Sequence, residues 1–205
     1  RNGDKDSLNL EKVHKMVEHA CEGLAGVSAS QVEISSGIQF FDGIETSQIQ
    51  EILVKSASDL ISLETPNYQY VASRLLLFDL RKQLNDHYED HPFILDHVKK
   101  CADLDVYDKT IIEKYTEDEW KEIDSYIDYN RDYLFSYAGM RQVVDKYLVQ
   151  DRSSGELYET PQQMYIMIAA TLFQEYPQET RLDYVKRYSV SYTHLRATRP
   201  STISY

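Results

Sequence analysis

The sequence contains few of the residues that mark several common classes of protein. Its two cysteines, Cys21 and Cys101, form no CxxC or other metal-ligand spacing. This low cysteine usage fits a reduced compartment, and we expect a cytoplasmic protein. No run of about 18 apolar residues occurs, so no transmembrane helix is predicted. Seven glycines and five prolines in 205 residues indicate few tight turns.

Positive charge is also scarce. The chain has 22 Lys and Arg against 34 Asp and Glu, for a formal net charge of −12. Binding to nucleic acid or to a membrane surface needs a basic face that neutralises phosphates, so we expect neither partner. One small anion site built from a few lysines and helix N-termini is still compatible with this charge. What the chain does contain is 42% hydrophobic residues and 17 tyrosines, enough for a packed core with aromatic contacts between helices.

Apolar residues recur at helical spacing along most of the chain, which predicts a mainly α fold. Asn9 is the expected N-cap of the first helix, which should end at Gly23 to Gly26. A capping box is expected at residues 47–50 and another at 116–119. The sequence predicts one β-hairpin, with strands at 147–150 and 156–158. The further helices are expected at residues 28–40, 47–61, 66–84, 92–104, 108–114, 117–126, 128–146, 161–173 and 178–188.

Composition divides the chain into three segments. The polar tract NDHYEDHP, residues 85–92, predicts a boundary between domains at 1–84 and 85–188. Residues 189–205 read SVSYTHLRATRPSTISY, with no acidic residue and no usable period. We expect this last segment to be disordered and unrelated to the preceding fold, as at a junction in an assembled sequence.

Spacing alone singles out three residues that are suited to binding an anion. Lys12 lies one turn into the first helix, where it and the nearby backbone N–H groups suit a phosphate, or where it is simply a solvated lysine. Thr46 begins another helix and has the form of an ordinary cap. Lys82 ends a helix, where the helix dipole alone favours a cation.

Two further groups have structural explanations that we favour. His87 and His91 are four residues apart, as metal ligands on a helix are, but Pro92 follows directly and no third ligand is nearby. The segment DYNRD, residues 128–132, resembles a catalytic cluster, but a solvated face or a local ion pair is the explanation that we favour. No GxGxxG, GxxxxGKS, HExxH or GxSxG motif occurs, so we assign no catalytic and no metal-binding residue.

Longer stretches resemble two known domains. RNGDKDSLNLEKV, QVE…IQFFDGIETSQIQE and YQYVASRLLLFDLRK resemble the ATP-cone, a small regulatory nucleotide-binding domain. YDKTIIEKYTEDEWKEIDSYIDYNRDYLFSYAGMRQVVDKYLVQ and ETPQQMYIMIAATLFQEYPQETRLDYVKRY resemble the N-terminal helical domain of the large (α) subunit of class I ribonucleotide reductase. The resemblance is nearly continuous over residues 1–188. It implies a mainly α chain: a helical ATP-cone, then a helical domain with a small β-hairpin, without the catalytic α/β barrel.

The resemblance also implies a function. An α subunit of this family reduces ribonucleoside diphosphates to deoxyribonucleotides for DNA synthesis, with a cysteine radical generated by a partner β subunit. ATP activates and dATP inhibits through the cone, by changing the assembly of α homo-oligomers. Neither Cys21 nor Cys101 matches a catalytic cysteine, so we expect the chain alone to be inactive. A free-standing adenine-nucleotide-sensing module acting on a protein partner is the alternative, and a helical scaffold without a ligand is a third.

Nucleotide contacts follow from the same resemblance. Lys12 and Lys82 would hold phosphates, Thr46 would add a hydroxyl, and Asp6 and Asn9 would lie near the adenine. The remaining expected contacts are Ser7, Leu8, Leu10 and Glu11. The expected effector is ATP or dATP, with Mg²⁺ as an optional companion.

Three departures from the family pattern lower the expected affinity for nucleotide. The first strand of a cone usually brings a lysine just before the position of Arg1, and this chain starts after it. Asp6 stands where relatives often have Glu, and Gln50 where some have His. Losing one phosphate-binding lysine costs about 1–3 kcal/mol, so we expect weak binding.

Overall fold

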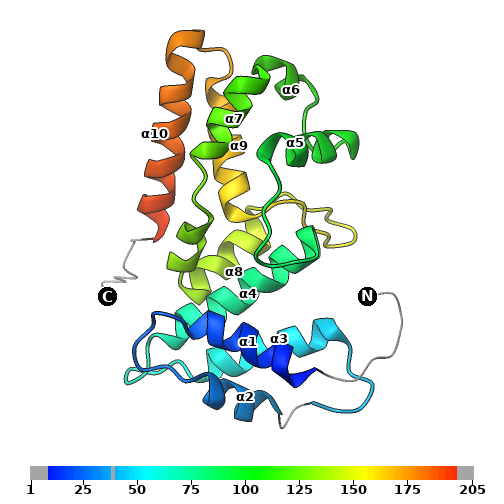
Figure 1. Ribbon diagram of the computed structural model, residues 1–205, viewed down its shortest axis with the longest axis vertical. Coiled ribbons are helices and arrows are strands. Elements are labelled where there is room, and N and C mark those ends of the chain that lie inside the picture. The colour runs from blue at the N-terminus through cyan, green and yellow to red at the C-terminus, as the bar shows by residue number, and fades with distance from the viewer. Residues whose placement is uncertain (1–8, 38–39, 198–205) are drawn as a thin grey trace. The chain divides into compact units, whose positions relative to one another are not determined.

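Helices make up most of the computed structural model, as the sequence predicts (Figure 1). The structure describes residues 9–37 and 40–197, and for residues 191–197 it describes the backbone alone. Within these residues, no helix is both long and apolar enough to cross a membrane. The helices are α1 (Leu10–Cys21), α2 (Ala29–Gly37), α3 (Thr46–Asp59), α4 (Tyr68–Asn85), α5 (Ile94–Asp103), α6 (Thr110–Lys114), α7 (Glu117–Ser125), the 3-10 helix η1 (Tyr129–Leu134), α8 (Tyr137–Lys146), α9 (Pro161–Phe173) and α10 (Gln178–Ala197).

The chain divides into two compact units. The first consists of Arg1–Leu80 and Phe135–Arg141, and the second of Arg81–Leu134 and Gln142–Tyr205. Both α4 and α8 therefore begin in the first unit and end in the second.

The first unit is built around α1, α2, α3 and most of α4. Helix α2 packs against both α1 and α3 (Figure 1). Apolar residues at helical spacing supply the core, because that spacing places them on one face of each helix. The fully buried members from the first three helices are Val17, Ala20, Val32, Leu53 and Ala57.

Hydrogen bonds attach the loop between α1 and α2 to side chains of α4. Gly23 takes a φ of +72°, which a residue with a side chain rarely adopts, and α1 ends there as predicted. Arg74 of α4 donates from Nη1 to the carbonyl of Glu22 at 2.7 Å. The hydroxyl of Tyr68 accepts from the backbone N–H of Ser28 at 3.0 Å. These bonds satisfy backbone groups in a segment that has no helical partners for them.

The second unit has its own hydrophobic core around Trp120, which is 1% exposed. Helices α9 and α10 lie side by side, and α9 is buried along most of its length (Figure 1). An ion pair joins α10 to α7, with Arg181 Nη2 and Nε at 2.6 and 2.7 Å from the carboxylate of Glu119. The other buried members of this core are Ile94, Leu95, Val98, Ile111, Tyr115, Ile123, Ile166, Met167, Ala169, Ala170 and Val185.

Two predicted elements around residues 128–158 differ from the structure. The helix expected at 128–146 is interrupted, with η1 and α8 separated at residues 135–136. The hydroxyl of Ser136 accepts from the N–H of Gly139 at 3.2 Å, so it caps a new helix at the interruption. The predicted hairpin is reduced to one antiparallel bridge between Gln150 and Leu157, closed by a turn in which Gly155 has a φ of +76°.

Two predicted helix ends also differ. The capping box of α3 starts at Glu45, two residues earlier than expected, because Gln48 Oε1 accepts from the N–H of Glu45 at 3.1 Å. The expectation of disorder from residue 189 is wrong for residues 189–197, which continue α10 without interruption. No Gly or Pro occurs between Tyr188 and Pro200, and Ser189 is 6% exposed, so nothing in the sequence ends this helix at 188.

Candidate functional site

The predicted nucleotide contacts begin at the N-terminus of α1. Asn9 caps this helix, as its sequence position predicts: its Oδ1 accepts from the backbone N–H of Lys12 at 3.0 Å. The first-turn N–H groups of a helix point toward its N-terminus and carry partial positive charge. An anion at this end of α1 therefore meets backbone donors and a lysine together.

Lys12 is exposed at this end of the helix. Within the described residues its ammonium makes no ion pair. Lys15, one turn further on, is already paired with Glu11 at 3.1 Å. Leu10 is also exposed, to 62%, although it is apolar. The first turn of α1 thus offers one available cation and an apolar side chain to solvent.

Thr46 and Gln50 lie near the start of α3. Thr46 is the first residue of the helix and is exposed, which leaves its hydroxyl accessible. Gln50 is 4% exposed and donates from Nε2 to the carbonyl of Leu75 at 2.9 Å. The side chain of Gln50 therefore binds the backbone of α4 inside the first unit. It is not available to a phosphate in this arrangement.

Lys82 belongs to the second unit, in the last turn of α4. Its Nζ lies 5.4 Å from the centroid of the Tyr88 ring, a cation–π contact. The C-terminal position of Lys82 on α4 agrees with the sequence analysis. Tyr88 was not singled out there, because its approach to Lys82 depends on the turn between them.

Asp6, Ser7 and Leu8 lie outside the described residues. The structure brings Asn9, Leu10, Glu11 and Lys12 together on one helical turn, with Thr46 in the same unit. The joint participation of these residues and Lys82 in nucleotide binding stays a prediction.

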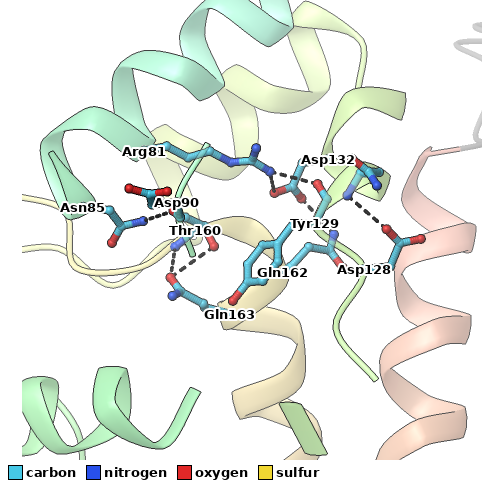
Figure 2. A network of polar contacts seen from close by, with 10 residues as sticks. Arg81, Asn85, Asp90, Asp128, Tyr129, Asp132, Thr160, Gln162 and Gln163 are labelled. Atoms are coloured by element: carbon cyan, nitrogen blue, oxygen red, sulfur yellow. Dashed lines mark hydrogen bonds and ion pairs between the residues drawn. The ribbon is translucent and has the colours of Figure 1, made fainter. Parts of the chain in front are cut away.

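A buried polar network lies in the second unit (Figure 2). Arg81 donates from Nη2 to the carbonyl of Tyr129 at 2.8 Å and to Asp132 Oδ2 at 3.3 Å. Gln162 of α9 donates to Asp132 Oδ1 at 2.8 Å. Arg81 is 2% exposed and Asp132 is fully buried. Burial raises the pKa of Asp132 to about 6, against the opposing effect of the Arg81 charge.

The network explains most of the candidates that the sequence analysis considered around residues 87–132. Asp132 pairs with a residue 51 positions away, whereas Asp128 pairs locally with Arg131 at 3.5 Å. His91 stacks on Tyr129 with ring centroids 3.7 Å apart. Burial, and then the charge of Arg81, lower the pKa of His91 to about 4, so it is neutral at pH 7. Within residues 9–37 and 40–190, no three His, Cys, Asp or Glu side chains are grouped to hold a metal ion.

The two cysteines are unsuited to nucleophilic chemistry in this arrangement. Cys21 and Cys101 are free thiols in different units. Burial raises the pKa of each to about 11, so both stay protonated at neutral pH.

Two family models match separate parts of the chain. The family model described as ATP cone domain matches residues 1–83, and the model described as ribonucleotide reductase, all-alpha domain matches residues 133–202. The second match extends past residue 188, where the sequence analysis placed the end of the family segment.

Similar proteins cover almost the whole chain. It is 47% identical to the ribonucleoside-diphosphate reductase subunit alpha of Haemophilus influenzae, over 99% of this chain and 27% of that protein. It is 48% identical to the ribonucleoside-diphosphate reductase 1 subunit alpha of Escherichia coli, and 36% identical to the subunit alpha of Enterobacteria phage T4, each over 26% of the relative. The chain thus spans about a quarter of the length of these relatives. Within that span it is similar to these alpha subunits, and it carries an ATP-cone domain followed by the all-alpha domain of ribonucleotide reductases.

Proposed function

We propose that this chain is the adenine-nucleotide-sensing part of a ribonucleoside-diphosphate reductase alpha subunit. The observation that carries the proposal is the start of α1, where an Asn9-capped first turn and the exposed Lys12 lie within the residues matched to the ATP cone. Such a helix start favours an anion through its N–H groups and its dipole. The effector would be ATP or dATP, with Mg²⁺ as an optional companion.

The chemistry of each side chain suggests a role. Lys12 and Lys82 each supply a positive charge for a phosphate oxygen, and Thr46 supplies a hydroxyl. Asn9 already accepts from the N–H of Lys12 through Oδ1. Its remaining polar group is the NH₂, which is a donor and suits an acceptor nitrogen of adenine. Asp6 would accept from the exocyclic amino group of the same base.

The whole subunit would reduce ribonucleoside diphosphates to deoxyribonucleotides for DNA synthesis in the cytoplasm. Its partners would be a reductase β subunit and further copies of the α subunit, and nucleotide binding would set that assembly. The names of the relatives and the two domain matches in sequence support this proposal. Neither Cys21 nor Cys101 is assigned a catalytic role, because neither matches a catalytic cysteine of the family.

Calorimetric titration of the purified chain with ATP, dATP and GTP, each with Mg²⁺, tests the proposal. We expect ATP and dATP to bind with similar affinity, since they differ by one hydroxyl, and GTP to bind more weakly. Lys12→Ala should weaken ATP binding by about 10- to 100-fold, as expected for the loss of a charge-assisted contact.

Lys15→Ala is the matched control, because Lys15 is exposed on the same helix but is paired with Glu11. It should bind ATP as the parent does. Absence of ATP binding by the parent, or equal affinities for the Lys12 and Lys15 variants, would contradict the proposal.

A further inference from the structure

The turn that follows α4 has a specific geometry. Asp86 takes a φ of +63°, in the left-handed region, and its N–H donates to the carbonyl of Lys82 at 3.1 Å. This is the αL termination of a helix, with a residue other than Gly in the left-handed position. Asn85 Nδ2 donates to the carbonyl of Asp90 at 3.1 Å and closes the segment behind the turn (Figure 2).

This turn carries Tyr88 back over the last turn of α4. The ring centroid of Tyr88 lies 5.4 Å from Lys82 Nζ, and both side chains are half-buried. A cation at this distance from a tyrosine face is attracted by the ring quadrupole. The contact therefore favours one region of space for the ammonium of Lys82.

Such a contact is compatible with anion binding by the same ammonium. An aromatic face contacts only one side of an ammonium group, and the N–H bonds on the opposite side point away from the ring. An immobilised long side chain loses its rotamer freedom, and this loss opposes every contact it makes. When the ring has already restricted the lysine, less of that entropy is lost on binding a phosphate.

We propose that Tyr88 is a positioning residue for phosphate binding by Lys82. The inference rests on the proposed function, in which Lys82 contacts a nucleotide phosphate. Tyr88 does not touch the nucleotide: it holds the ammonium of Lys82 from behind and raises the affinity for ATP through that lysine alone.

Calorimetric titration of the whole chain with Mg²⁺ and ATP tests this role through a double-mutant cycle. Tyr88→Leu should weaken binding by about two- to fivefold, the range expected for a half-exposed cation–π contact. Tyr88→Phe keeps the aromatic face and should bind ATP as the parent does. In the Lys82→Ala background, Tyr88→Leu should have no further effect, because the lysine through which it acts is gone.

Tyr126→Leu is the matched control. Tyr126 makes an equivalent contact with Lys186, at 5.2 Å, elsewhere in the second unit. Its loss should not change the affinity for ATP. A Tyr88 substitution that acts only by loosening the fold would weaken binding equally with and without Lys82, and the cycle would then overturn the inference.

A measurement on the parent keeps the inference testable if Tyr88→Leu does not fold. The side-chain methylene signals of Lys82, identified by their loss in Lys82→Ala, should show an upfield ring-current shift in NMR spectra, retained in Tyr88→Phe. An unshifted signal overturns the inference.

The outcomes separate the two proposals. ATP affinity that falls in Lys82→Ala but not in Tyr88→Leu overturns the role of Tyr88 alone, as does tighter binding by Tyr88→Leu. An unchanged affinity in Lys82→Ala removes Lys82 from the proposed site and overturns the inference with it.

Discussion

Replacing Asp132 by alanine should lower the free energy of unfolding of the second unit by about 3–5 kcal/mol. The substitution leaves the guanidinium of Arg81, which is 2% exposed, without its carboxylate. Arg81 Nε already lacks a hydrogen-bond partner among the described residues, so little remains to compensate the charge. Gln162 loses its acceptor at the same time.

Burying the ionised Arg81–Asp132 pair itself costs free energy. Burial raises the pKa of Asp132 from 3.8 to about 6, which corresponds to about 3 kcal/mol against ionisation in the folded state. A folded pKa above the unfolded one means that stability falls as pH rises from about 4 through about 6. Replacing both partners, Arg81→Met with Asp132→Leu, should therefore cost much less than Asp132→Ala alone and should remove this pH step.

Urea denaturation at pH 5 and pH 7.5 measures these differences. The fluorescence of Trp120 reports on the second unit, because it is the single tryptophan and lies in that unit's core. Asp128→Ala is the control, since Asp128 forms a half-exposed pair with Arg131 and should change stability by less than about 1 kcal/mol. An Asp132→Ala variant that is no more destabilised than Asp128→Ala, or a double replacement that costs as much as the single one, would contradict the buried ion pair as the cause.

Two further predictions concern charged contacts between helices. The pKa of His14 is raised, first by its hydrogen bond to Glu33 across the α1–α2 contact, so this link should be present below pH 6.5 and lost as pH rises through the elevated pKa. In Glu33→Gln, the pKa of His14 measured by NMR titration should move toward its ordinary value. An unchanged pKa would show that Glu33 is not the cause of the shift. Glu119→Gln should lower the free energy of unfolding by about 1.5–3 kcal/mol, because it weakens a bidentate, mostly buried pair with Arg181. Denaturation followed by Trp120 fluorescence would measure this loss, and a change below about 0.5 kcal/mol would show that solvent screens the pair.

Local signals in the sequence are sufficient to predict most helices of this chain. The Asn9 cap, the Thr116 capping box and the helix start at residue 161 all occur as predicted, because each depends on residues within one turn of the helix. The α3 start is the exception. Glu45 was not considered as a cap, although Gln48 three residues later completes the same box pattern.

Contacts between distant residues could not be predicted in the same way. The pairing of Arg81 with Asp132 joins positions 51 apart, and one sequence contains no signal for it. The buried residue Asp132 lies in the 3-10 helix η1, which replaces the start of the helix predicted at 128–146. The approach of Tyr88 to Lys82 depends on the positive φ of Asp86, which side-chain spacing does not reveal. Within the candidate site, the sequence therefore predicts that Lys12 and Lys82 lie at helix ends. It does not predict the contact between Tyr88 and Lys82.

The continuity of α10 has a practical consequence for anyone producing this domain. A shortened version ending at Tyr188, as composition would suggest, cuts the helix nine residues before Ala197. The ring of Tyr188, which contacts Phe173 of α9, would then lie on the frayed last turn, and the buried Ser189 would be lost. An expression boundary after residue 197 keeps the α9–α10 pair intact.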